Sequence, residues 1–325
     1  MKKLDLLKLP ELLLFSLVLT LGGYSSHCIA ETNINLLSAA ESASVKDISH
    51  MIESGGNVNV KSKYGITPLH VAAYNGRNDV IQLLIAKGAN INAKSETGNT
   101  PLHLAVNNGD KNVSDLLISK GANINAKNEE GDSPLDIAAL NGYMDVAELL
   151  ISKGADINSK DNVGYTPLYS AAQEGHKEMV AFLIAKGGDA NAKASGKGTD
   201  GYSPLLIATK RGHTDVVELL LSKGADYTVR SETGITSFHL AAYFGRKEIT
   251  KLLIGKGADI NAKNIDGDTP LHFSIQSEDK EMAELLIANG ADVNAKNYNG
   301  YTPMYWASLH KNKALVNLLT QYGGK

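Results

Sequence analysis

A stretch of about a dozen residues recurs along this chain at nearly constant spacing, and no other feature limits the possible folds as strongly. Eight copies begin at glycines, as in "GITPLHVAAYNG" from Gly65 and "GNTPLHLAVNNG" from Gly98. Successive copies start 33 residues apart, with a single step of 37 between Gly164 and Gly201. A second glycine series, mostly within "KGANIN" or "KGADIN", keeps the same period. Such a period predicts an array of stacked units, because one unit is too small to bury its own apolar face.

The copy that starts at Gly98 shows why each unit should contain two helices. Thr100 is a suitable N-cap, and Pro101 occupies the first helical position, where its missing N–H costs nothing. Apolar residues three and four apart follow, which predicts a short helix with one buried side. After a turn at "NNG" the pattern predicts a second helix from Val113 to Lys120, ended by a glycine in the left-handed cap. A hairpin-like loop should then lead to the next copy.

The copy that starts at Gly267 departs from this pattern. It reads "GDTPLHFSIQSE" and lacks both the alanine pair and the turn glycine of the other copies. This departure predicts looser packing around Glu278.

The recurring segments resemble the motif of a known family. The patterns "G-x-T-P-L-H-x-A-A-x-x-G" and "V-x-x-L-L-I-x-K-G-A-D-x-N-A" resemble those of ankyrin repeats over nearly the whole chain after residue 35. The resemblance implies an all-α solenoid of about nine stacked helix-turn-helix repeats, with hairpin tips and first helices lining a concave binding face. We expect a single ankyrin-repeat domain over residues 31–325, with repeats at about 36–64, 65–97, 98–130, 131–163, 164–200, 201–233, 234–266, 267–299 and 300–325.

The first 30 residues are expected to direct export. Lysines at the start, the apolar run Leu12–Leu21 and the small residue Ala30 follow the layout of a secretory signal peptide. The run has 10 residues, whereas a membrane-spanning helix needs roughly 20. We therefore predict cleavage between Ala30 and Glu31, and a periplasmic or secreted protein.

Two alternatives remain open for the segment around Cys28, the only cysteine of the chain. Lipid attachment would need a small residue directly before Cys28, where His27 stands. In the second alternative the apolar run is not cleaved and anchors the chain. A membrane is expected as a partner only if this N-terminal segment is retained. The excess of lysine over arginine, 28 to 4, favours a bacterial source with an AT-biased genome.

No combination of residues predicts catalysis, a cofactor or a metal site. Histidines recur at one repeat position, but a stack sets them one repeat apart instead of around one point. We interpret them as structural residues bonded within their turns. The net charge of −3, without a basic stripe, argues against a general nucleic-acid binder. The histidines are His70, His103, His239 and His272.

Residues that the repeat does not dictate are the candidates for binding a protein partner. Tyrosine combines a large contact area with a polar tip and is enriched at binding hot spots. Positive charge beside Tyr165 and Tyr202 would suit an acidic partner segment. The candidates are Tyr64, Tyr74, Tyr165, Tyr202, Lys197, Lys210, Arg211, Tyr243, Phe244, Tyr298 and Tyr301.

The expected function is a non-enzymatic, exported scaffold that binds a protein on the concave face. The alternative is a structural extracytoplasmic spacer or envelope organiser, in which the length of the array matters more than any one surface.

Overall fold

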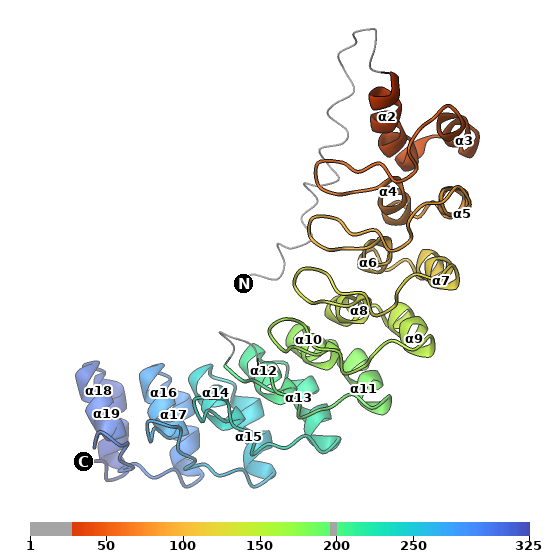
Figure 1. Ribbon diagram of the computed structural model, residues 1–325. Coiled ribbons are helices and arrows are strands. Elements are labelled where there is room, and N and C mark those ends of the chain that lie inside the picture. The colour runs from red at the N-terminus through yellow and green to blue at the C-terminus, as the bar shows by residue number, and fades with distance from the viewer. Residues whose placement is uncertain (1–27, 196–199) are drawn as a thin grey trace. The chain divides into compact units, whose positions relative to one another are not determined.

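The computed structural model describes residues 28–195 and 200–325, which form helix pairs and contain no strand (Figure 1). This confirms the all-α class and the helix-turn-helix unit. The first helices of the pairs are α2 (Cys28–Ser42), α4 (Pro68–Tyr74), α6 (Pro101–Asn107), α8 (Pro134–Asn141), α10 (Pro167–Glu174), α12 (Pro204–Arg211), α14 (Ser237–Tyr243), α16 (Pro270–Gln276) and α18 (Pro303–Leu309). The second helices are α3 (Val45–Glu53), α5 (Asn78–Ala86), α7 (Lys111–Ser119), α9 (Met144–Ser152), α11 (Lys177–Ala185), α13 (Thr214–Ser222), α15 (Lys247–Gly255), α17 (Lys280–Ala288) and α19 (Lys313–Gln321).

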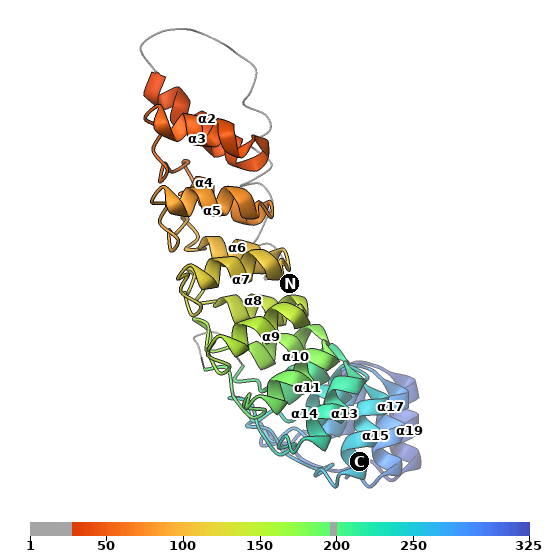
Figure 2. The ribbon, with the colours of Figure 1, turned by 90° about the vertical axis from the view of Figure 1, so that its right-hand side faces the viewer.

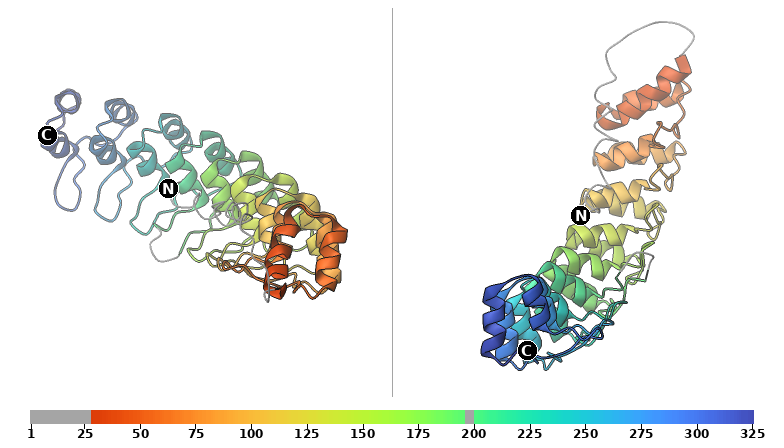
Figure 3. Two further views of the ribbon diagram at one scale, coloured as in Figure 1. Left: turned by 90° about the horizontal axis from the view of Figure 1, so that it is seen from above. Right: turned by 90° about the vertical axis from the view of Figure 1, so that its left-hand side faces the viewer.

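The described residues divide into two compact units. The first unit contains the residues up to Ala138 together with Asp145–Ala155, and the second contains Ala139–Met144 and Asp156–Lys325. Within the first unit α4 packs against α6, and within the second α10 packs against α12 and α14 against α16. Neighbouring helix pairs therefore run side by side in each unit (Figure 2). The long loops extend to one side of the helix pairs (Figure 3).

A reciprocal cap fixes the start of most first helices. Thr67 is extended, with φ −105° and ψ 165°, and its side chain accepts a hydrogen bond from the backbone N–H of His70. The His70 ring in turn accepts a bond from the backbone N–H of Thr67, at 3.2 Å. Pro68 fills the first helical position. This capping box satisfies donors that the start of a helix leaves open.

The predicted start of the second helix in the third repeat was two residues late. Helix α7 begins at Lys111, because the Asp110 side chain caps it by accepting a bond from the Val113 N–H at 3.0 Å. The helix ends at Ser119, and Gly121 follows with a φ of 97°. Its left-handed backbone matches the predicted glycine cap.

Asparagines join successive hairpin loops. The Asn59 side chain accepts a bond from the Asn90 N–H at 2.7 Å and donates to the Gly88 carbonyl at 3.0 Å. The same link recurs in later repeats, for example from Asn261 to Gly290 at 3.2 Å. At residue 228 threonine occupies this position, and its hydroxyl donates to Asp226 instead.

The looser packing predicted around Glu278 is absent. Ser274 and Ile275 are fully buried, and Asp279 N–H donates to the Ser274 carbonyl at 3.0 Å as the turn closes. Glu278 replaces the turn glycine by adopting a φ of 56°. The turn therefore keeps its shape without glycine. The left-handed backbone costs a residue with a side chain roughly 1–2 kcal/mol in stability.

The first helix begins earlier than the repeat pattern indicated. Helix α2 starts at Cys28, and the Ala30–Glu31 bond predicted to be cleaved lies near its beginning. Cleavage remains a prediction, and the apolar run Leu12–Leu21 lies outside the described residues. None of the helices in the described part of the chain has both the length and the apolarity needed to cross a membrane.

Candidate protein-binding surface

Large apolar side chains that remain exposed in the described structure gather in the last third of the chain. Isolated exposed apolar residues are ordinary, whereas groups of them mark interaction sites. The exposed fraction of Tyr298 reaches 71% and that of Tyr243 is 44%. The group comprises Tyr243, Phe244, Ile265, Tyr298, Tyr301, Tyr305, Leu309 and Tyr322.

Apolar side chains of the sixth to eighth repeats, called the inner patch below, are linked by packing against one another or against a shared buried cluster. Tyr202 and Phe273 pack against a buried cluster that includes Leu240. The Tyr243 ring lies 6.1 Å from the Phe273 ring and 5.1 Å from the Phe244 ring, centroid to centroid, both edge to face. The inner patch comprises Tyr202, Val229, Tyr243, Phe244 and Phe273.

Basic side chains border the inner patch at the end of α12. The Lys210 ammonium lies 4.9 Å from the centre of the Tyr202 ring and 3.9 Å from an Asp200 carboxylate oxygen. Burial, and then the charge of Asp200 and its hydrogen bond, raise the pKa of Tyr202 to about 12. Arg211 is exposed beside Lys210. The predicted combination of Tyr202, Lys210 and Arg211 therefore exists, although Asp200 offsets part of its charge.

Tyr165 has a packing role that the sequence did not reveal. Its ring stacks on the Tyr169 ring with centroids 4.1 Å apart, and Tyr169 is only 4% exposed. Burial raises the pKa of Tyr169 well above its usual range, while the charge of Arg211 acts in the opposite direction. Arg211 is thus electrostatically coupled to this pair. Tyr165 itself stays half-buried.

Two predicted contact residues, Tyr64 and Tyr74, belong to the first unit and are half-buried. Tyr64 packs against a cluster of Ala40, Ile66 and Val71. The Lys63 ammonium lies 4.7 Å from the Tyr64 ring centre. Tyr64 therefore contributes to packing in its own unit.

The remaining residues predicted to bind a partner lie in the last two repeats or outside the residues that the structure describes. Lys263 approaches the Tyr298 ring centre to 5.7 Å. Tyr301 stacks on Tyr305 at 4.0 Å between centroids and meets the edge of Trp306 at 5.9 Å. Lys197 lies outside the described residues.

Sequence reasoning missed Phe273, Tyr305 and Trp306. A signal was present, because the position directly after the recurring histidine changes from aliphatic to aromatic at the end of the array. Phe273 and Trp306 are half-buried there. In earlier repeats the position holds a buried aliphatic residue, with the exception of the buried Ser170 in the fifth; the aliphatic residues are Val71, Leu104, Ile137, Ile207 and Leu240.

The recurring histidines are structural, as predicted. Each imidazole Nε2 bonds to a backbone carbonyl 29 residues further on, as His103 does to Asp132 at 3.2 Å. In the described part of the chain no three His, Cys, Asp or Glu side chains come together as a metal ion would require.

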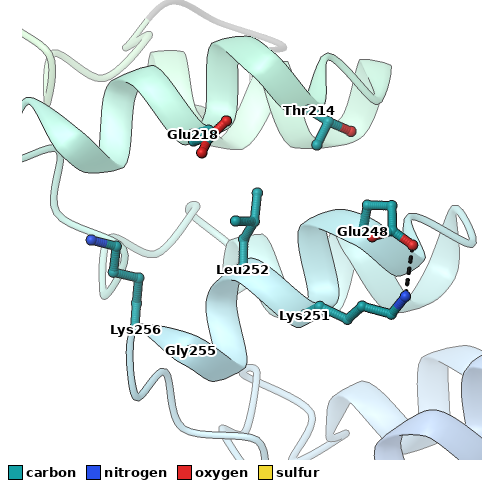
Figure 4. Close-up of a pocket in the computed structure, with 7 residues that line it drawn as sticks. All are labelled: Thr214, Glu218, Glu248, Lys251, Leu252, Gly255 and Lys256. Atoms are coloured by element: carbon teal, nitrogen blue, oxygen red, sulfur yellow. Dashed lines mark hydrogen bonds and ion pairs between the residues drawn. The ribbon is translucent and has the colours of Figure 1, made fainter.

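An open groove of about 520 Å³ lies between α13 and α15 (Figure 4). Its charged lining residues are Glu218, Glu248, Lys251 and Lys256, and Lys251 donates a hydrogen bond to Glu248 at 2.8 Å. Two acidic and two basic side chains balance one another, so the groove offers no preferred ligand charge.

Helix pairs with a 33-residue period, joined by hairpin loops that bond to one another, define a helical repeat protein. The family described as ankyrin repeats (3 copies) matches residues 36–128, 93–161, 135–231 and 238–325. The chain therefore belongs to the ankyrin-repeat family, as its motifs indicated. Ankyrin repeats are generally protein–protein interaction modules and typically non-enzymatic scaffolds. A search of the curated proteins found no significant match.

Proposed function

We propose that the protein is an exported, non-enzymatic scaffold that binds a protein partner on the inner patch, used as part of a concave binding face of the kind expected of the family. One observation carries the proposal: Tyr243 and Phe244 are exposed at the end of α14, where stacking does not require aromatic side chains. Other repeats hold polar residues at the position of Phe244, including Asn75, Asn108 and Arg211.

The chemistry of the inner patch fits a partner segment that is both apolar and acidic. Tyr243 and Phe273 lie on short helices and Tyr202 lies just before one, and packed aromatic side chains of this kind lose little entropy on binding. Lys210 and Arg211 lie at one edge and would attract carboxylates to the rim of the interface. Apolar anchors would supply affinity, and the rim charges would mainly set orientation and association rate.

The double substitution Tyr243→Asn and Phe244→Asn tests the proposal. Peptides displayed on phage and selected on the full chain should contain apolar residues next to Asp or Glu. Their affinity for the variant should fall by about tenfold or more, as for the loss of hot-spot aromatics. Titration calorimetry with one selected peptide measures this change.

The control is Tyr322→Asn, which removes an aromatic side chain of similar exposure, 43%, from the end of α19. Asparagine already stands at the matching position 289, so the control should fold and bind normally. Since all three side chains are exposed, stability should change by no more than about 0.5 kcal/mol. Equal affinity of both variants for the selected peptides would refute the inner patch as the binding surface.

Export is supported by the N-terminal sequence pattern and is tested separately. The intact mass and N-terminal residue of the native protein should show a soluble chain that begins at Glu31, recovered outside the cytoplasm. A chain that keeps Cys28 in the membrane fraction would instead establish an anchored or lipidated scaffold.

A further inference from the structure

The ends of neighbouring first helices in the second unit carry contrasting side chains at one repeat position. Helix α12 ends with Lys210 and Arg211, and the same two positions of the next repeat hold Tyr243 and Phe244. The pairs on either side of these two are polar and contain no basic or aromatic residue. The four pairs, called the helix-end row below, are residues 173–174, 210–211, 243–244 and 276–277.

Stacking of the repeats requires neither the basic nor the aromatic pair. Among the first helices of the described residues, α12 alone has basic residues in its last turn. Tyr243 is 44% exposed and Phe244 37% exposed, so their rings add little to the core. Arg211 is exposed, and no ion pair joins it to a carboxylate within the described part of the chain. Both pairs are therefore available to a partner.

A hydrogen bond between the two repeats places the basic pair beside the aromatic pair. Arg246, two residues after Phe244, donates from Nη2 to the Lys210 backbone carbonyl at 3.1 Å. Helices α12 and α14 also pack against each other. Because equivalent positions of stacked repeats differ by a step of one repeat, both pairs face the same side. Packed helices set this step at about 8–10 Å.

The step of one repeat restricts the conformation of a segment that contacts both pairs. In a polyproline II helix every third residue lies on the same face, about 9.3 Å further on. Residues on one face of a β-strand are about 7 Å or about 13 Å apart, and neither distance matches the step. An α-helix matches it only after seven residues, at about 10.5 Å. The number of residues between two anchors thus distinguishes the conformations.

Resting on the function proposed above, we propose that the partner presents a polyproline II segment in which an apolar residue and an Asp or Glu are three residues apart. The apolar residue packs on Tyr243 and Phe244, whose rings meet edge to face at 5.1 Å. The carboxylate bonds to Arg211, with Lys210 beside it. Such a segment is extended before it binds, so it loses little entropy, and aromatic-lined surfaces are known to accept it.

The test measures the binding of labelled peptides to the full chain by fluorescence anisotropy. Three peptides on one proline-rich background place a leucine and a glutamate two, three or four residues apart. A fourth has lysine in place of glutamate at a separation of three, and a fifth is a stapled α-helix with leucine and glutamate seven apart. Each is made with the two residues in both orders, and the tighter order is compared. The glutamate peptide with a separation of three should bind at least about tenfold more tightly than each of the others.

Substitutions within the helix-end row assign this specificity to the basic pair. Lys210→Gln with Arg211→Ser introduces the residues of the eighth repeat, so the variant should fold. Its preference for glutamate over lysine should fall to about twofold or less. Adding Gln276→Lys and Ser277→Arg moves the basic pair to the other neighbour of the aromatic pair. This second change should restore the preference at the same separation of three.

The variant Tyr243→Asn with Phe244→Asn separates this inference from the proposed function. If it loses the peptides, but the wild type binds all separations equally or does not prefer glutamate to lysine, the inner patch remains the binding surface and the polyproline II segment is overturned. Tighter binding of the stapled helix, or no binding of any peptide, overturns the segment as well. Binding that the aromatic change leaves unaltered contradicts both proposals.

Discussion

Lowering the pH from 7.5 to 5 should reduce the free energy of unfolding by an amount on the order of 5 kcal/mol, because three buried histidines resist protonation. Burial lowers the pKa of His70, His103 and His239 to about 4, from an ordinary value of 6.5. Between pH 6.5 and 4 the unfolded chain therefore binds protons that the folded chain does not. The contribution of these neutral histidines to stability is therefore fully present above pH 6.5, and it is lost as the pH falls from 6.5 to 4.

The hydrogen bonds explain why these imidazoles stay neutral. A backbone N–H can only donate, so the bond from Thr67 N to His70 Nδ1, at 3.2 Å, requires an unprotonated Nδ1. The proton then resides on Nε2 and is donated to the Asn99 carbonyl at 3.0 Å. A second proton on Nδ1 would oppose the Thr67 N–H and break the helix cap. Acidification should thus weaken the helix cap, whereas the bond from Nε2–H to the Asn99 carbonyl is available in both protonation states.

Urea denaturation followed by far-UV circular dichroism at pH 7.5, 6 and 5 measures the effect. The hydrogen bonds from Lys87 and Lys247 lower the pKa of Glu53 and Glu281, so these two surface carboxylates favour the ionised form. The variant His103→Leu is the control, since leucine occupies this position as Leu206. It should be less stable at pH 7.5 by about 1–3 kcal/mol through its lost bonds. Its further loss down to pH 5 should be smaller by about 2 kcal/mol, one histidine's share. An unchanged pH dependence would show that His103 does not cause it.

The repeating fold was predictable because local and tertiary requirements coincide in each copy. Thr100 and Pro101 can start a helix in isolation, and the glycine at 121 can end one. Their recurrence every 33 residues also predicts which helices become neighbours. A single copy could not predict this. The start of α7 was missed because the cap came from Asp110, a residue that varies between repeats.

The binding surface was predicted less completely, since exposure depends on neighbours that no local pattern reveals. Tyr165 and Tyr301 are alike in sequence, yet Tyr165 stacks on the buried Tyr169 and Tyr301 stacks on the exposed Tyr305. Phe273 was not among the predicted binding residues, and only its contact with Tyr243 joins it to the inner patch. The asparagine links between hairpins could not be predicted from a local pattern either, because Asn59 bonds to a residue 31 positions away.

Replacing Gly98 by alanine should destabilise the protein by about 3 kcal/mol or more, from two causes that add. Gly98 has a φ of 74°, which costs a residue with a side chain roughly 1–2 kcal/mol. Its Cβ would also lie 2.6 Å from the backbone N of Glu129. That N–H donates to the Thr97 carbonyl at 3.0 Å, so the methyl group would push apart the hairpins that this bond joins. Backbone atoms cannot rotate away as a flexible side chain can, and strain of this kind costs further free energy.

Gly121→Ala separates the two causes. Gly121 also has a positive φ, 97°, but its Cβ would meet nothing within 4 Å. It should therefore show only the backbone cost of roughly 1–2 kcal/mol. Urea denaturation at pH 7.5 compares the two variants, and amide hydrogen exchange at Glu129 locates the damage, which should appear in Gly98→Ala alone. If the two substitutions cost the same, the close approach of neighbouring hairpins contributes nothing to stability, and the stack is held by its helices.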